Sequence, residues 1–131
     1  MKLTWLTALL FPKRCPFCGA VIPQKDRCCR RCENALPLPR RDLCRGCGNA
    51  PCICGEDWPL KGVFPAFEYR DGAAWAIRQM KFHNRPAIAR RLAPYLAEAL
   101  PEGPTFDAVV PIPMRSAAVR KRGYNQAALL A

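Results

Sequence analysis

The chain has few acidic residues, a single histidine and no long apolar run. Ten Asp and Glu stand against 21 Lys and Arg among 131 residues, which gives a formal net charge of +11. No apolar stretch reaches the roughly 20 residues that a transmembrane helix needs, so we expect no membrane span. The lone His83 lies at a basic helix end, where a solvated role is favoured over catalysis. The absence of a long apolar run argues against a membrane protein. The sequence also offers no convincing general base.

The N-terminal residues 1–12 carry Leu3, Leu6 and Leu10 on one helical stripe, which predicts an amphipathic helix. The same stretch superficially resembles a signal peptide. Its apolar core is short, however, and no small-x-small cleavage site follows it. We therefore expect a cytoplasmic protein whose thiols are reduced.

Nine cysteines are concentrated in residues 13–57. This stretch is too polar to form a hydrophobic core unless metal ions or disulfides cross-link it. A C-x-x-C turn places two sulfurs on one side of a tight loop, where they can bind one tetrahedral Zn²⁺, and two such turns per ion make a zinc ribbon. The spacing predicts a double zinc ribbon over residues 13–57 with two structural zinc ions. The predicted ligands are Cys15, Cys18, Cys29 and Cys32 for the first ion and Cys44, Cys47, Cys52 and Cys54 for the second.

Four thiolates leave no open coordination position, so a catalytic metal is disfavoured, and the repeated pairs argue against a redox C-x-x-C motif. Cys28 is left over and could replace Cys29, but Cys29 restores the two-residue spacing to Cys32. The Cys52-x-Cys54 pair is one residue tighter than usual, which suggests a weaker second site. With eight thiolates and two zinc ions, the net charge falls to about +7.

Residues 58–131 differ from the cysteine-rich stretch, because their apolar residues follow the alternating pattern of strands and the periodicity of helices. An edge strand is predicted at 62–69, and a buried-type strand at 106–113 whose prolines end regular pairing. A helix capped by Asp71 should run to about Phe82. A second helix should start with Pro86 at its first position and be kinked by Pro94.

A cluster of basic residues follows the second predicted strand, with no acidic residue between Ala108 and Ala131. Such a patch suits phosphate or nucleic acid, although a solvated helix face is the alternative. Tyr124 could add a stacking surface for a base or belong to the core. The candidate phosphate- or nucleic-acid-binding residues are Lys81, Arg85, Arg115, Arg120, Lys121, Arg122 and Asn125.

The whole pattern resembles the ComF/GntX family of bacterial competence-type proteins. The resemblance rests on the N-terminal Leu-rich helix, Cys-Pro-Phe-Cys-Gly, the second ribbon, Met80-Lys81-Phe82, Val-Pro-Ile-Pro at 110–113 and Arg-Gly-Tyr-Asn-Gln at 122–126. It implies that residues 58–131 open a type I phosphoribosyltransferase-like domain, in which residues 110–114 would receive pyrophosphate. The family continues to paired acids followed by Thr-Thr-Gly, which this sequence lacks, so we expect an N-terminal fragment or a truncated product with no catalytic residue.

The resulting fold expectation is a small β-rich zinc-ribbon module followed by the incomplete start of an α/β domain. Its expected function is that of an accessory protein of DNA uptake, which handles single-stranded DNA or a competence helicase-type partner through the ribbons and the basic face. The alternative is a phosphoribosyl pyrophosphate-dependent transferase with an unidentified acceptor. That alternative requires the absent motif, so phosphoribosyl pyrophosphate is expected as a ligand only if the missing part is present.

Overall fold

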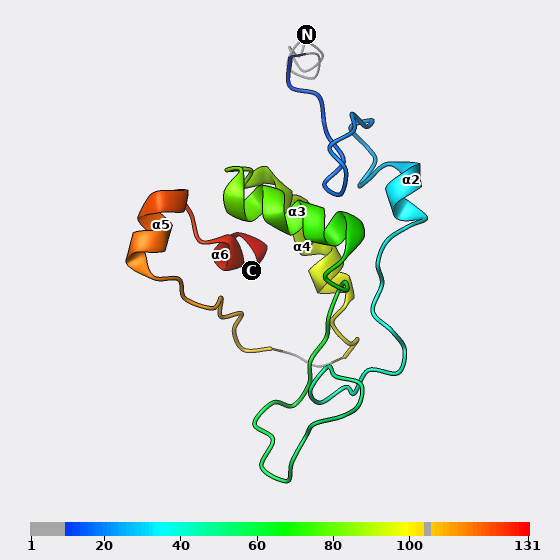
Figure 1. The fold of residues 1–131 in the computed structure, drawn as a ribbon, viewed down its shortest axis with the longest axis vertical. Coiled ribbons are helices and arrows are strands. Elements are labelled where there is room, and N and C mark those ends of the chain that lie inside the picture. Colours follow the sequence, from blue (N-terminus) through cyan, green and yellow to red (C-terminus); the bar gives the residue numbers. More distant parts are fainter. Residues whose placement is uncertain (1–9, 104–105) are drawn as a thin grey trace.

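The computed structural model describes residues 10–103 and 106–131, and Figure 1 shows their arrangement. Most of the predicted N-terminal helix, residues 1–12, lies outside the described residues. None of the described helices is long and apolar enough to cross a bilayer. The described helices are α2 (Arg30–Glu33), α3 (Asp71–Phe82), α4 (Ala87–Glu98), α5 (Ser116–Arg122) and α6 (Gln126–Leu130).

Helix α3 confirms the first predicted long helix and turns an alanine-rich face inward. Ala73, Ala76 and Met80 on this face are almost fully buried. The predicted cap is wrong by one residue, because the N-cap is Arg70 and Asp71 is the first residue of the helix. The Asp71 carboxylate binds the Arg70 guanidinium at 2.7 Å instead of capping a backbone N–H.

Helix α4 confirms the second predicted long helix. The predicted position of Pro86 is wrong by one residue, because Pro86 is the N-cap and Ala87 is the first residue of the helix. The helix buries Ile88, Ala89 and Leu92. The helix runs through Pro94, which has no N–H to donate to the preceding turn. Asn84 takes a left-handed φ of 49° in the tight turn that joins α3 to α4.

One hydrophobic core joins the first cysteine loop to these two helices. Cys15, Phe17 and Ile22 of the loop lie in the same buried cluster as Met80 of α3 and Leu92 of α4. Every one of these side chains is less than a tenth exposed. The predicted division of the chain at residue 57 stays a prediction, and this core contains residues from both sides of it.

Aromatic and charged contacts extend this junction toward the end of α4. The rings of Phe17, Phe67 and Tyr95 lie 5.4–5.5 Å apart, centroid to centroid, in edge-on or tilted geometry. The guanidinium of Arg27 lies 4.1 Å from the centroid of the Tyr95 ring and also binds Glu98 of α4 at 2.6 Å. Exposed pairs of this kind contribute about 1 kcal/mol each, so packing dominates the junction.

The two C-terminal helices are short, and they pack differently. Helix α6 lies against α4, and its Leu129 and Leu130 pack against the core. Its N-cap Asn125 accepts a 2.9 Å hydrogen bond from the N–H of Ala127. Helix α5 lies at the margin of the molecule beside the end of α3 (Figure 1), and Gly123 ends it with a left-handed φ of 85°.

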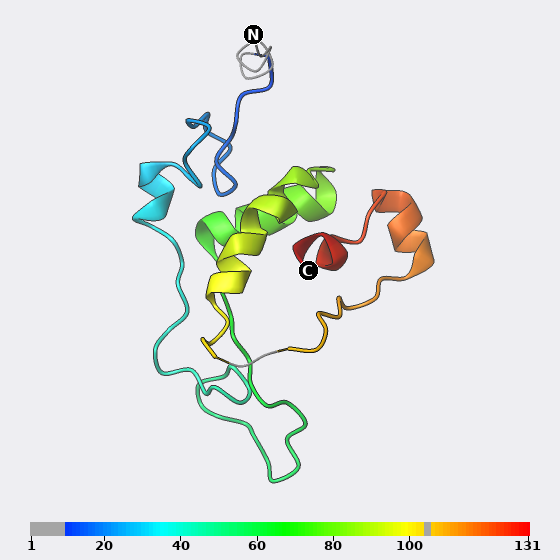
Figure 2. The same cartoon turned by 180° about the vertical axis from the view of Figure 1, so that it is seen from behind.

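The second cysteine group lies in the long segment between α2 and α3, away from the helices (Figure 2). The segment is closed at its base by a 2.8 Å hydrogen bond from the Glu68 N–H to the Pro37 carbonyl. Inside it, the Val63 N–H donates to the Arg45 carbonyl at 2.9 Å, and the Trp58 indole donates to the Gly46 carbonyl at 3.1 Å. These bonds stabilise the segment internally.

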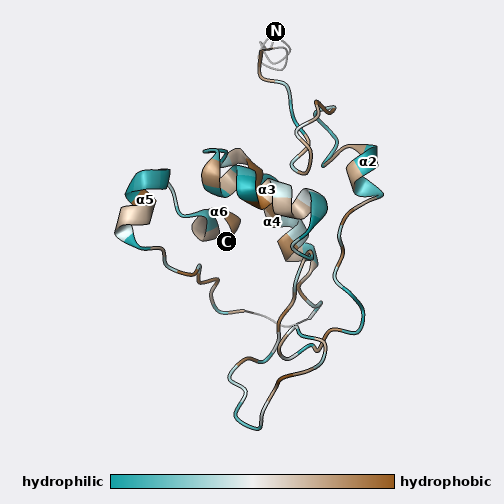
Figure 3. Cartoon of the chain, viewed as in Figure 1, coloured by the Kyte–Doolittle hydropathy of each residue, from teal (hydrophilic) through white to brown (hydrophobic). Residues whose placement is uncertain are grey.

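The two predicted strands are wrong for the described residues. The only bridge there is an isolated antiparallel pair, Arg14 with Val21, so the ribbon is not β-rich. Segments 62–69 and 106–113 form no strand. The Val63 and Glu68 N–H groups of the first make two separate hydrogen bonds and no ladder, and prolines in both segments remove donors. Figure 3 shows the hydrophobic colour of the second segment, in which Val110 is 82% and Ile112 is 80% exposed. The described residues therefore contain no sheet of the expected α/β domain.

Candidate metal centres and basic surface

The first cluster brings together the four predicted thiols of the N-terminal pairs. Their sulfurs all lie within 4.8 Å of one another, and the Cys18 and Cys29 sulfurs are 3.6 Å apart. A tetrahedral zinc ion with Zn–S bonds of about 2.3 Å requires sulfurs about 3.8 Å apart, whereas a disulfide requires about 2 Å. The donor set and its spacing therefore fit a zinc ion. Cys15, Cys18, Cys29 and Cys32 hold it.

The local backbone explains how one tight loop directs two sulfurs to the same point. The Gly19 N–H donates to the Cys15 carbonyl at 2.9 Å, and the Cys15 N–H donates to the Ala20 carbonyl at 2.7 Å. Gly19 takes a φ of 77°, which glycine adopts without strain. The second pair of ligands flanks the start of the short helix α2.

The second cluster is equally complete but more open. Its sulfurs also lie within 4.8 Å of one another, with Cys44 3.8 Å from Cys54 and 3.3 Å from Cys52. Each cluster has one buried thiol, Cys15 in the first and Cys47 in the second. The second has two exposed thiols, Cys52 and Cys54, and the first has only Cys18. A hydrogen bond joins the two residues of the tight Cys-x-Cys pair, in which the Cys54 N–H donates to the Cys52 sulfur at 3.4 Å.

The backbone around both clusters prepares some of the thiols for metal binding. The N–H of Cys32 lowers the pKa of Cys29 to about 7, and the N–H of Ile53 lowers the pKa of Cys47 to about 6. Desolvation and then the neighbouring thiols raise the pKa of Cys32 and Cys54. Four thiolates so close together need a cation between them, which a bound zinc ion supplies.

Comparison with known families agrees with this geometry. Residues 6–62 match the double zinc ribbon domain family. This segment is a double zinc ribbon. No curated protein and no solved structure is significantly similar to the chain. The double zinc ribbon carries two closed sites, in which zinc would act as a structural ion and stabilise the fold.

Cys28 lies outside both ligand sets, as the sequence spacing predicted. Its side chain is 7% exposed and belongs to the core, and burial raises its pKa. A buried thiol with a raised pKa is a poor nucleophile and packs like a small apolar side chain.

Three of the predicted basic residues line one cavity, a fourth lines a neighbouring cavity, and two line neither. Lys81 at the end of α3 lines a cavity of about 450 Å³ together with Lys121 and Arg122 of α5. Arg85 lies in the turn before α4 and lines a neighbouring cavity, while Arg115 and Arg120 line neither of the two. The assignment of all these residues to nucleic acid stays a prediction.

Two polar residues of the predicted patch have structural partners. The Asn125 side chain caps α6 and donates to the Ile112 carbonyl at 3.3 Å. The Tyr124 hydroxyl donates to the Met80 carbonyl, and the half-buried ring packs on the core. Of the two roles open for Tyr124, the structure therefore favours the core.

Sequence reasoning missed the aromatic side chain at the basic cavity. Phe82 lines the cavity beside Lys81, and it is 71% exposed. Its position held a usable signal, because Met80 marks the buried face of α3 and a residue two positions later points elsewhere. Arg14 and Arg91, which line the neighbouring cavity, were also missed. They are 77 residues apart, so no sequence motif joins them.

Proposed function

We propose that the chain binds single-stranded DNA on the basic surface between α3 and α5, and that the first zinc loop, which shares a core with α3, holds this surface in place. The observation that carries the proposal is the 450 Å³ cavity between these helices. Three basic side chains and the exposed Phe82 ring line it, and no acidic residue does.

This combination suits an unpaired strand better than an isolated anion. Lysine and arginine side chains neutralise phosphates and release condensed counterions, which drives binding without sequence preference. An exposed aromatic ring stacks on any base and contributes about 1–3 kcal/mol per base. Phe82 thus takes the stacking role for which Tyr124 was considered.

In this proposal the protein is a ComF-like accessory protein of DNA uptake that handles the incoming strand alone or with a helicase-type partner. The support is the family resemblance of the sequence together with the charge and aromatic content of the cavity. The phosphoribosyltransferase alternative rests on the resemblance alone, and no contact among the described residues favours it.

Fluorescence anisotropy of the zinc-loaded chain with a labelled oligothymidine tests the proposal. Three phosphate contacts predict a slope of log affinity against log salt of about −2 or steeper, at about −0.7 per contact. Lys81→Gln with Lys121→Gln should weaken binding and make the slope shallower by about 1.4. Phe82→Ala should weaken binding about fivefold or more at every salt concentration, since it removes stacking but no charge.

Charge-matched controls place the site. Lys25→Gln with Arg41→Gln removes two exposed charges from the ribbon and should leave the slope unchanged. A slope that responds to this control but not to the Lys81 and Lys121 pair would move the site to the ribbon. The absence of salt-sensitive binding in the wild type would refute the proposed function.

A further inference from the structure

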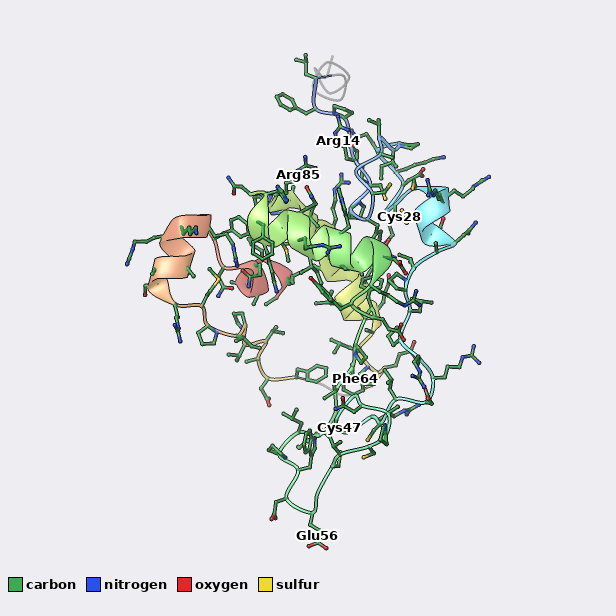
Figure 4. The ribbon with its side chains drawn as sticks, viewed as in Figure 1. Arg14, Cys28, Cys47, Glu56, Phe64 and Arg85 are labelled. Atoms are coloured by element: carbon green, nitrogen blue, oxygen red, sulfur yellow. The ribbon has the colours of Figure 1, made fainter. Side chains whose placement is uncertain are left out.

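A second basic cavity lies between the first zinc loop and the turn from α3 to α4. It has a volume of about 430 Å³. Its walls carry three arginines, Arg14, Arg85 and Arg91, and none of its lining residues is acidic. Figure 4 shows Arg14 and Arg85 on the same side of the molecule, close to this turn.

Two of these arginines are held by the zinc loop itself. The Arg14 guanidinium donates to the Gly19 carbonyl at 3.2 Å, and the Arg91 guanidinium donates to the Arg14 carbonyl. A guanidinium has five N–H donors, and each of these bonds uses one of them. The bonds fix the two side chains while further donors remain for a ligand, which lowers the entropic cost of binding an anion.

The fold adds a further positive field at the same place. Pro86, Ala87 and Ile88 at the first turn of α4 line the cavity. This 12-residue helix therefore directs the positive end of its dipole into the cavity. Backbone and side chains both favour a negatively charged group there.

A different reading is that the arginines only balance the charge of the first zinc site. Four thiolates and one zinc ion carry a net charge of about −2, and Cys15 is part of the cavity wall. The two recorded guanidinium bonds end on carbonyl oxygens and not on sulfur, however. The three arginines together carry a charge of +3, which is more than is needed to balance the charge of about −2 on the zinc–thiolate site.

We propose that this cavity binds a phosphate ester of the same DNA strand, so that the strand crosses the α3–α4 turn and passes beside the first zinc site. Asn84 lines both cavities, so the two basic surfaces are adjacent. The inference rests on the proposed function, to which it adds a second phosphate site and a path for the strand. It also predicts that strand binding depends on the first zinc site and not on the second.

The test compares variants of the zinc-loaded chain in two measurements, salt-dependent oligothymidine binding and zinc release to a chromogenic chelator. Six contacts over both cavities predict a wild-type slope of about −4. Arg14→Gln with Arg85→Gln should make it shallower by about 1.4 without faster zinc release. Arg85→Gln alone should make it shallower by about 0.7, and it serves as the milder variant because Arg85 is exposed in the turn.

Each other outcome has a distinct meaning. If the Lys81 and Lys121 pair changes the slope and the Arg14 and Arg85 pair does not, the proposed function holds and this second site is wrong. Faster zinc release with unchanged DNA binding would assign the arginines to charge balance and overturn the proposal. Inorganic phosphate binding that is lost in the arginine pair while DNA binding is unchanged would assign the cavity to a free anion. The absence of wild-type DNA binding would overturn both proposals.

Discussion

Replacing one exposed ligand in each zinc site separates the structural roles of the two ions. Cys18→Ser affects the first site and Cys54→Ser the second, and both side chains are exposed, so neither change removes buried volume. The first site shares its core with α3 and α4 through Cys15 and Phe17. We therefore expect Cys18→Ser to unfold these helices and Cys54→Ser to leave them intact.

The magnitudes support a qualitative difference between the two variants. A structural zinc ion contributes about 10–16 kcal/mol of coupled folding free energy. The free energy of unfolding of a whole domain is about 5–15 kcal/mol, so the loss of even half of the zinc contribution is enough to unfold what depends on it. Around the first site, this includes a core in which Phe17 alone accounts for about 3–5 kcal/mol on truncation to alanine.

Far-UV circular dichroism and zinc analysis measure the outcome. Cys54→Ser should retain one zinc ion and a helical signal with a cooperative thermal transition, whereas Cys18→Ser should lose the transition. The same asymmetry predicts that a chelator removes zinc from the second site first, because its ligands are more exposed. A cooperative helical transition in Cys18→Ser at the wild-type temperature, or its loss in Cys54→Ser, would refute the proposed dependence of the helices on the first site.

Two further substitutions test local geometry. Gly46→Ala should lower the zinc content from two ions to one, because the new Cβ would lie 2.9 Å from the Cys54 sulfur. Gly55→Ala is the control and should keep both ions, since no atom lies within 4 Å of its new Cβ. Mass spectrometry under native conditions counts the ions. Tyr124→Phe should lower the free energy of unfolding by about 1 kcal/mol in urea, since it removes the hydrogen bond to the Met80 carbonyl, and it should not change oligothymidine affinity. Weaker DNA binding with unchanged stability would return the stacking role to this tyrosine.

The parts of the structure that the sequence predicted well depend on local spacing. A C-x-x-C turn positions its two sulfurs through bonds within five residues, so both ligand sets could be read from the chain, including the choice of Cys29 over Cys28. The helices α3 and α4 also followed from local periodicity, and their predicted ends lie close to Phe82 and Pro86.

The parts that could not be predicted depend on contacts between distant residues. The pattern at 106–113 is typical of a buried strand, but a strand exists only where a partner pairs with it, and among the described residues none does. The core between the first zinc loop and α4 joins Phe17 to Tyr95, and no motif links them. The cavity of Arg14 and Arg91 likewise exists only because Arg91 reaches the zinc loop.

The hydrogen bond between Pro37 and Glu68 has a consequence for the length of the second ribbon. It fixes the two ends of the second ribbon side by side, so the core on either side does not depend on the length of the segment between them. The entropic cost of closing a loop changes by only about 0.6 kcal/mol for each doubling of its length. Leu38, Pro39, Pro65 and Ala66 still line a cavity with Tyr95 of α4, so they belong with the helices. We expect that the segment from Arg40 to Phe64 can be shortened, or exchanged for another metal-binding or recognition module, while the first ribbon and the helices keep their fold.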